Sequence, residues 1–288
     1  MPVYNGEPFI REALDSLLEQ TFTDYELIIS DNASTDNTET ICREYAAKDL
    51  RIKYIRQLVN KGATENFRLL VDQASAEYFM WSAADDKIAP EFLRVVYETI
   101  SSNEEIVLAM TDVQNIARDG AFLGITRIEN IRIEAVLANW TRIRRLFFEN
   151  PTSNIFFCVY GMYRTKVIRS VQLNYKEKVK YAAASEVPLL AQVSLLGKVV
   201  AIPSVLKMYR RHEDSVYHSE AKRITFFKDI HNKVNVSFVL FDILIHSSLT
   251  VTEKILNCGT IAFTFLRFVP GAVVRAPVRW LRANIFNR

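Results

Sequence analysis

The chain has 288 residues, of which 49% are hydrophobic and 24% charged, and its 36 basic and 33 acidic side chains leave a net charge of +3. This composition is that of an ordinary globular protein and excludes a disordered, collagen-like or fibrous chain. The near balance of charge argues against a nucleic-acid partner. The three cysteines, Cys42, Cys158 and Cys258, lie far apart without metal-ligand spacing, so we expect buried free thiols in a reducing compartment.

The chain begins with Met1-Pro2-Val3-Tyr4 and reaches the polar Asn5-Gly6-Glu7 at once, which is not a secretory signal. A central strand normally carries several apolar residues before its functional loop. We therefore expect that the first strand is clipped and that the true start lies upstream. No run approaches the roughly 20 uninterrupted apolar residues of a membrane span.

Helix-period and strand-like segments alternate over the first half of the chain. The expected elements, in order, are a helix over 9–18, a strand over 25–29, a helix to about 47, a strand over 52–55, a helix over 67–74, a strand over 78–81, a helix after Pro90 and a strand over 106–110. This alternation predicts an α/β fold whose mixed, mainly parallel sheet is flanked by helices.

The pattern is looser beyond residue 150. We expect a strand over 155–163, a helix over 186–196, strands over 199–202 and 205–209, and helices only from 222 to the end. The predicted organisation is a catalytic domain over 1–220, with a nucleotide-binding half (1–110) and an acceptor half (111–220), followed by a helical C-terminal region (221–288).

Two acidic loops directly follow strands, one at Asp31 and one at Asp85-Asp86. In parallel α/β sheets the ligand crevice lies at the carboxyl ends of the strands. Adjacent carboxylates repel each other, and a bound cation such as Mg²⁺ or Mn²⁺ would offset this repulsion. The alternative is a solvated loop with a helix-capping Asp. Asp31 could bond a base or ribose, or cap its own turn.

Several enzyme signatures are absent from the sequence. There is no G-x-G-x-x-G and no Walker sequence, so dinucleotide oxidoreductases and P-loop enzymes are not indicated. The four histidines show no zinc spacing.

An ordered set of motifs resembles family-2 glycosyltransferases. The set is Pro2-Val3-Tyr4-Asn5, Ser16-Leu17-Leu18-x-Gln20-Thr21-Phe22, Tyr25-Glu26-Leu27-Ile28-Ile29-x-Asp31-Asn32-x-Ser34-x-Asp36, Asn60-x-Gly62, Asn66 and Asp85-Asp86-x-x-x-Pro90. The resemblance is strong over about residues 1–100 and weak to about 216. It implies a GT-A fold and inverting transfer of a sugar from a nucleoside-diphosphate donor, with a divalent metal.

The resemblance also implies residue roles. Pro2, Val3 and Tyr4 would border the nucleobase, and Asp31 would bond the base. Asp85 would approach the ribose, while Asp86 would ligate Mn²⁺ or Mg²⁺. Many members carry further Asp residues where this chain has Ala83 and Asn32, which leaves fewer metal ligands.

Inverting transfer requires a base for the acceptor hydroxyl. The family usually places an acidic residue at the start of a helix before a Gly-Lys-type strand, where this chain has Glu186, with Val187 in place of a frequent Asp. Glu186 could instead only complement its helix dipole. Asp112, at a strand end, is the rival base.

Arg210-Arg211-His212-x-x-Ser215 resembles the Arg-x-His-x-x-Ser segment of non-processive members, and Arg211 and His212 suit diphosphate oxygens. A solvated basic loop is the alternative. The Gln-x-x-Arg-Trp signature of processive synthases is missing, so we expect addition of a single sugar.

The C-terminal segment 267–288 has five arginines and no acidic residue, and Val278, Leu281 and Ile285 share one helical face. This pattern is typical of an interfacial helix on anionic lipid, and a helical cap on the enzyme body is the alternative.

The sequence therefore predicts an inverting, single-sugar transferase acting in cell-surface polysaccharide synthesis. We expect a UDP-sugar donor, a lipid-linked or glycan acceptor, and a cytoplasmic protein held peripherally on the inner face of the plasma membrane. A catalytically degenerate nucleotide-sugar binding protein and a sugar nucleotidyltransferase are the alternatives.

Overall fold

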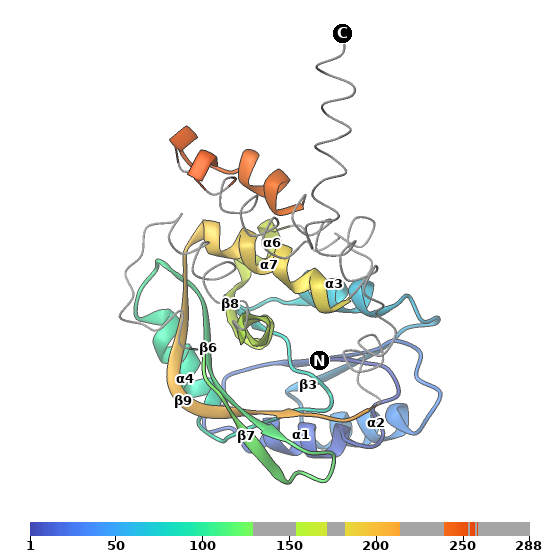
Figure 1. The fold of residues 1–288 in the computed structure, drawn as a ribbon. Coiled ribbons are helices and arrows are strands. Elements are labelled where there is room, and N and C mark those ends of the chain that lie inside the picture. Colours follow the sequence, from blue (N-terminus) through green and yellow to red (C-terminus); the bar gives the residue numbers. More distant parts are fainter. Residues whose placement is uncertain (129–153, 172–181, 214–238, 253, 257, 259–288) are drawn as a thin grey trace, which may run out of the picture.

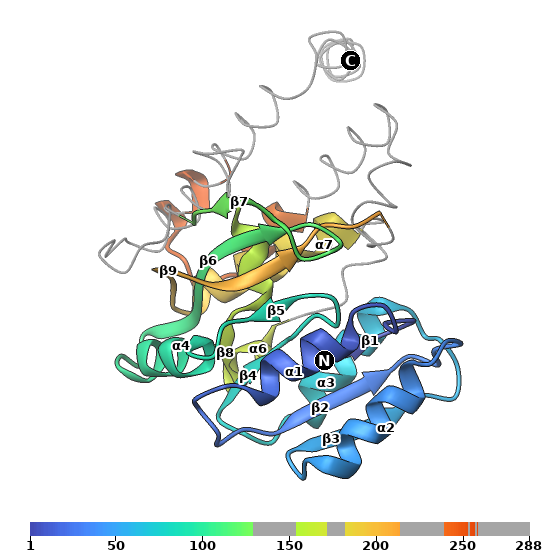
Figure 2. The same cartoon turned by 90° about the horizontal axis from the view of Figure 1, so that it is seen from below.

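The structure is a computed structural model that describes residues 1–128, 154–171, 182–213, 239–252, 254–256 and 258. Its elements divide between a three-stranded and a six-stranded sheet. Figure 2 shows the first sheet and its helices on one side of the molecule, with the long strands of the second sheet on the other.

The three-stranded sheet is parallel, in the order β1–β2–β3. Its strands and helices are β1 (Pro2–Val3), α1 (Ile10–Leu18), β2 (Leu27–Asp31), α2 (Thr38–Lys48), β3 (Ile52–Arg56) and α3 (Ala63–Gln73). Helix α3 lies on one side of this sheet and α1 and α2 lie on the other (Figure 1). Parallel neighbours bring the carboxyl ends of all three strands, and the loops that follow, to one edge.

Helix α1 shows why the sequence pattern was sufficient for this half. Its apolar positions Ile10, Ala13, Leu14 and Leu17 are all buried, as the helical period predicted. Helix α3 begins after Gly62, whose φ of 84° is readily adopted only by glycine.

The six-stranded sheet is mixed. It comprises β4 (Tyr78–Met80), β5 (Lys87–Ile88), β6 (Ile106–Ile116), β7 (Phe122–Thr126), β8 (Met162–Arg164) and β9 (Lys198–Arg210). The order is β4–β8–β6–β9–β5, and β7 pairs with β6. Only β6 and β9 are parallel in this sheet, so the expected mixed, mainly parallel character comes chiefly from the N-terminal half. The boundary expected at residue 110 falls inside β6.

The remaining elements surround this sheet. They are α4 (Phe92–Ser101), the 3₁₀ helix η3 (Asn154–Tyr160), α6 (Thr165–Ser170) and α7 (Ala182–Leu196). The two short strands expected at 199–202 and 205–209 are one irregular strand, β9, because its register against β6 shifts between Thr111 and Asp112 without ending the pairing.

The strand expected over 155–163 is wrong for most of its length. Residues 154–160 form η3, and only Met162–Arg164 is a strand. Phe157, Cys158 and Val159 are consecutive and all buried, which a helical turn inside the core permits and an alternating half-exposed strand does not. Gly161 follows, where a Cβ would lie 2.6 Å from the carbonyl oxygen of Ala109. Glycine at this position therefore lets the backbone between η3 and β8 approach the backbone of β6 closely.

Part of the C-terminal region is described, and it is helical at 239–245. Leu240, Leu244 and Leu249 form a small buried cluster with Ala191 of α7. Among the residues that the structure describes, no helix has the length and apolar character needed to cross a bilayer. The proposed interfacial segment 267–288 and Ser215 lie outside the described residues.

Candidate functional site

The pairing of β5 with β9 brings together the two most informative motifs. The strands are antiparallel, with Lys87 opposite Met208 and Ile88 opposite Lys207. Continuing this register by two residues sets Asp85 against Arg210. The acidic loop after β4 and the basic end of β9 therefore meet, although they are more than a hundred residues apart in the sequence.

Asp85 and His212 are in direct contact at this junction. The Nε2 atom of His212 lies 3.0 Å from Oδ2 of Asp85. The Asp85 side chain is 34% exposed, so a ligand can reach its carboxylate. The His212 ring also packs on Phe9, with ring centroids 4.6 Å apart. The Asp85 carboxylate is thus accessible at this point, whereas the His212 side chain beside it is only 6% exposed.

Asp86 has a different environment from its neighbour. Its side chain is 2% exposed, and Oδ2 forms an ion pair with Nζ of Lys207 at 2.7 Å. Its other oxygen accepts a hydrogen bond from the backbone N–H of Arg210 at 3.0 Å. Burial raises the pKa of the Asp86 carboxyl, and the Lys207 ammonium acts in the opposite direction. The role of metal ligand expected for Asp86 is therefore not the one that its surroundings favour, because its charge is already matched inside the protein.

The expected nucleobase edge is built from the loops after β1 and β2. Val3 is buried in β1, whereas the next residue, Tyr4, is 49% exposed. Asn5 ties the two loops together, because its backbone N–H donates to Ser34 Oγ at 2.9 Å and its Oδ1 accepts from the Thr35 N–H at 2.8 Å. Pro2 and Val3 thus form the buried strand beneath this edge, and the exposed Tyr4 is the residue that a nucleobase could contact.

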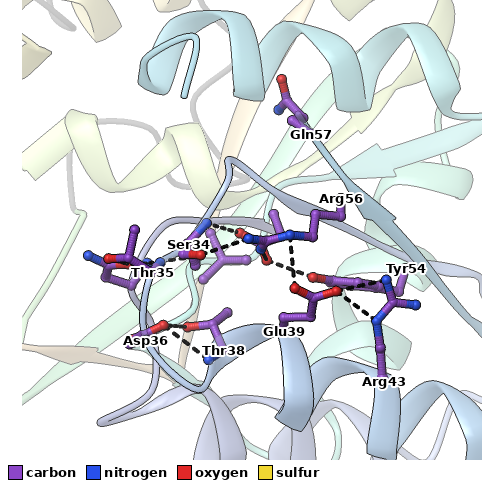
Figure 3. A network of polar contacts seen from close by, with 12 residues as sticks. Ser34, Thr35, Asp36, Thr38, Glu39, Arg43, Tyr54, Arg56 and Gln57 are labelled. Carbon is purple, nitrogen blue, oxygen red and sulfur yellow. Dashed lines mark hydrogen bonds and ion pairs between the residues drawn. The ribbon is translucent and has the colours of Figure 1, made fainter. Parts of the chain in front are cut away.

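Asp31 accepts hydrogen bonds from a polar network at this edge, of which Ser34, Tyr54 and Arg56 are labelled in Figure 3. Its Oδ2 accepts from the Tyr54 hydroxyl and from Nη1 of Arg56, each at 2.6 Å, and Oδ1 accepts from the Ser34 N–H at 2.8 Å. Burial alone would raise the pKa of Asp31, but the bonds from Ser34 and Tyr54 and the charge of Arg56 lower it below its ordinary value. The sequence left two roles for Asp31, a bond to the base or ribose and a cap of its own turn. These contacts favour the cap.

Arg211 differs from its buried neighbour Arg210 in being exposed. Its Nε donates to Oδ1 of Asn115 at 3.0 Å, which fixes the base of the guanidinium. The two terminal nitrogens make no hydrogen bond to any residue in the described part of the chain. This leaves them able to bind anionic oxygens, as expected for a diphosphate contact.

Glu186 lies in α7 and is half-buried. It is close enough to Asp85 and Asp86 for all three carboxylates to affect the same tyrosines. Burial, together with the charges of Asp86, Glu186 and Asp85, raises the pKa of Tyr160 well above its usual value, and Tyr209 shifts in the same direction. Glu186 thus belongs to the surroundings of Tyr160 and Tyr209.

Asp112, the rival base, is 3% exposed and lies within β6. Its Oδ1 accepts a hydrogen bond from the Ile128 N–H at 2.9 Å, which anchors the chain after β7. A base for an acceptor hydroxyl must be reachable by that hydroxyl. Glu186 meets this requirement better than Asp112.

Sequence reasoning missed three contributors to this site: Lys207, Arg210 as a buried group, and Tyr160. Lys207 stands in a mostly apolar strand, and a lone lysine there could have suggested a buried countercharge. Tyr160 lies in the segment that we expected to be a strand, and no sequence pattern predicted that it is close to the acidic loop. Its ring lies 4.9 Å from the Lys207 ammonium.

Two proteins with known names are similar to this chain in sequence. An "Uncharacterized glycosyltransferase" of Haemophilus influenzae is 26% identical over 263 residues, which are 87% of this chain and 77% of the relative. The dTDP-rhamnosyl transferase RfbG of Shigella flexneri is 44% identical over 91 residues, covering 30% of this chain and 32% of that protein.

Two solved structures share the fold. S. aureus TarS 1-349 in complex with UDP-GlcNAc has a TM-score of 0.67 at 18% identity, over 93% of this chain and 71% of that chain. The mannosyltransferase PcManGT from Pyrobaculum calidifontis, in complex with GDP-Man and Mn²⁺, has a TM-score of 0.55 at 14% identity, over 99% of this chain and 79% of that chain. The expected GT-A fold is thereby confirmed. The sequence model of Glycosyl transferase family 2 matches residues 1–171, more than half of the chain, and the protein is a glycosyltransferase of that family.

Proposed function

We propose that this protein transfers a single sugar, with inversion, from a UDP-sugar to a lipid-linked or glycan acceptor in cell-surface polysaccharide synthesis. The observation that carries the proposal is the junction of Asp85 and His212 at the end of β9, where the adjacent residue, Arg211, is exposed. A carboxylate, an imidazole and an exposed guanidinium together suit a diphosphate and its cation. The binding of UDP-GlcNAc by the structural neighbour TarS supports the choice of donor.

The donor set of this junction fits the divalent cation that the GT-A fold usually employs. Asp85 and His212 offer one oxygen and one nitrogen, 3.0 Å apart. No group of three or more His, Cys, Asp or Glu side chains suited to a metal occurs in the described ranges. Mg²⁺ and Mn²⁺ commonly take one or two protein ligands and fill the remaining positions with phosphate oxygens and water. We therefore assign Asp85, rather than Asp86, as the carboxylate that would hold the cation.

The residues of the chain would divide the remaining tasks. A cation held there would neutralise the charge that develops on the departing nucleoside diphosphate. Arg211 would bind a phosphate oxygen of the donor, and Tyr4 would lie along the base. Glu186 would take the proton from the acceptor hydroxyl. Asp86 would not compete with Asp85 for the cation, because its carboxylate is buried in an ion pair with Lys207.

Release of nucleoside diphosphate from UDP-GlcNAc, UDP-glucose, GDP-mannose and dTDP-rhamnose, with Mn²⁺ and a membrane extract as acceptor source, tests the proposal. Turnover of one UDP-sugar, and its loss in Asp85→Asn, is the expected result. Binding of nucleotides without any turnover would instead support a degenerate binding protein. Formation of a nucleotide sugar from a sugar phosphate and a nucleoside triphosphate would identify a nucleotidyltransferase.

A dTDP-sugar is the second candidate donor. It is favoured by the 44% identity to the dTDP-rhamnosyl transferase RfbG over 91 residues. Uracil and thymine present the same hydrogen-bonding edge, so the base edge near Tyr4 suits both. The same panel separates the two, because turnover of dTDP-rhamnose alone would replace the UDP-sugar assignment.

Attachment to the cytoplasmic face of the plasma membrane remains part of the proposal. It is supported by the five arginines and absent acids of residues 267–288. Flotation with anionic vesicles should retain the full chain and lose a chain that ends at residue 266. Equal binding of the two would exclude this segment as the membrane contact.

A further inference from the structure

We propose that Arg210 is a positioning residue, which holds the Asp85 carboxylate and the His212 imidazole beside each other from within the protein. The inference deepens the proposed function and rests on it. Arg210 differs in this role from Arg211 and His212, which the sequence analysis expects at diphosphate oxygens, because the Arg210 side chain is turned inward.

Each nitrogen of the Arg210 guanidinium donates a hydrogen bond inside the protein. Arg210 is 1% exposed. Its Nε donates to the carbonyl oxygen of Asp85 at 2.9 Å, and Nη1 donates to the carbonyl oxygen of Arg118 at 2.8 Å. Its Nη2 donates to Oε2 of Glu12 at 2.9 Å. These contacts join β9 to the acidic loop, to the turn after β6 and to α1, and the burial of the group keeps it away from a phosphate.

Arg210 holds the acidic turn at two points. Its side chain binds the main-chain oxygen of Asp85, and its own backbone N–H binds the carboxylate of Asp86 at 3.0 Å. Fixing both residues of the turn restricts the direction in which the Asp85 carboxylate can point. That carboxylate is the one that His212 meets.

Phe9 links Arg210 to His212, the partner of Asp85. The Arg210 guanidinium carbon lies 4.9 Å from the centroid of the Phe9 ring, and the His212 ring lies 4.6 Å from it. Guanidinium and imidazole thus both pack on one aromatic ring at the start of α1. Substitution of partners that orient ligating groups in this way typically lowers metal affinity by about 10- to 100-fold.

Two variants and one control test the inference on the full chain. Arg210→Lys keeps the charge but loses the fork of donors. Glu12→Gln removes the anionic partner of Arg210, and Glu12 also pairs with Nζ of Lys87 at 3.4 Å. Glu44→Gln is the matched control, because Glu44 also accepts from two cations, Arg11 at 2.9 Å and Lys48 at 2.7 Å, on the surface of α2. Circular dichroism establishes that each variant is folded.

The readout is the affinity for Mn²⁺ in the presence of saturating UDP, measured by electron paramagnetic resonance. We expect Arg210→Lys to weaken Mn²⁺ binding by about 10- to 100-fold and Glu12→Gln by about 10-fold, with Glu44→Gln unchanged. Added Mn²⁺ should restore much of the lost kcat. A role in folding alone would lower the melting temperature and leave Mn²⁺ affinity at wild-type strength.

Wild-type affinity in both folded variants would overturn the inference. If Arg210→Lys does not fold, Glu12→Gln decides alone. Failure of the wild-type chain to bind Mn²⁺ with UDP, GDP or dTDP would contradict the proposed metal site, and the inference with it. That outcome is distinct from the first because it appears before any substitution is made.

Discussion

Lys207 and Asp86 form an ion pair in which Nζ lies 2.7 Å from Oδ2 and both side chains are almost completely buried. The pair joins β9 to the acidic loop directly after the carboxylate that we assign to the cation. Two adjacent carboxylates thereby acquire different tasks. One is neutralised by the protein, and the other remains accessible to a ligand.

Lys207→Met should destabilise the protein by about 3–5 kcal/mol, because it leaves the Asp86 carboxylate buried without its countercharge. The double variant Lys207→Met/Asp86→Asn should recover part of this loss. Urea unfolding followed by circular dichroism measures both. Lys198→Met is the control, since Lys198 pairs with the exposed Glu105, and it should cost about 0–1 kcal/mol. Equal losses at positions 207 and 198 would contradict this account.

Asp31→Asn should lower stability at pH 7 by about 2 kcal/mol, because the bonds from Tyr54 and Arg56 lose their charged acceptor. The folded pKa of Asp31 is below its unfolded value, so this stabilisation is complete above about pH 4 and is lost as the pH falls through the folded pKa. The difference in unfolding free energy between wild type and variant should therefore shrink below pH 4. A difference that is the same at pH 3 and pH 7 would refute the assignment.

Glu186→Gln should lower kcat by about 10²- to 10⁴-fold at saturating donor, with little change in donor KM, since a base acts on the acceptor and not on the nucleotide. Asp112→Asn should have a much smaller effect on kcat, because an amide oxygen can still accept the Ile128 N–H. Initial rates over a range of donor concentrations make the comparison. Full activity of Glu186→Gln would remove it as the base and leave Asp112 as the candidate.

The thiols of Cys42 and Cys158 should resist alkylation in the native protein. Both are buried, and burial raises the pKa of each to about 12. At pH 8 about one thiol in ten thousand would be ionised, and the thiolate is the reactive form. Iodoacetamide labelling followed by peptide mass spectrometry should modify the less buried Cys258 first. Rapid labelling of Cys158 would show that the core around η3 is open.

The N-terminal half illustrates how far local pattern extends. The apolar spacing of α1 and the short apolar strand β2 specify their own secondary structure and buried faces. The acidic residues at the end of β2 and after β4 locate the candidate site. The segment 154–160 shows where local pattern fails. Its apolar and aromatic residues suit a strand equally well, and only burial on all sides of the turn makes it a helix.

By itself the sequence determined the class of the fold, the family and the two acidic loops of the candidate site, because these depend on spacing along the chain. Only the tertiary structure decided which of two adjacent carboxylates is open to a ligand and which arginine is buried. That choice depends on the antiparallel register of β5 against β9, which sets Lys207 beside Asp86 and His212 beside Asp85. Contacts between residues more than a hundred positions apart are fixed by packing, and no local pattern encodes them.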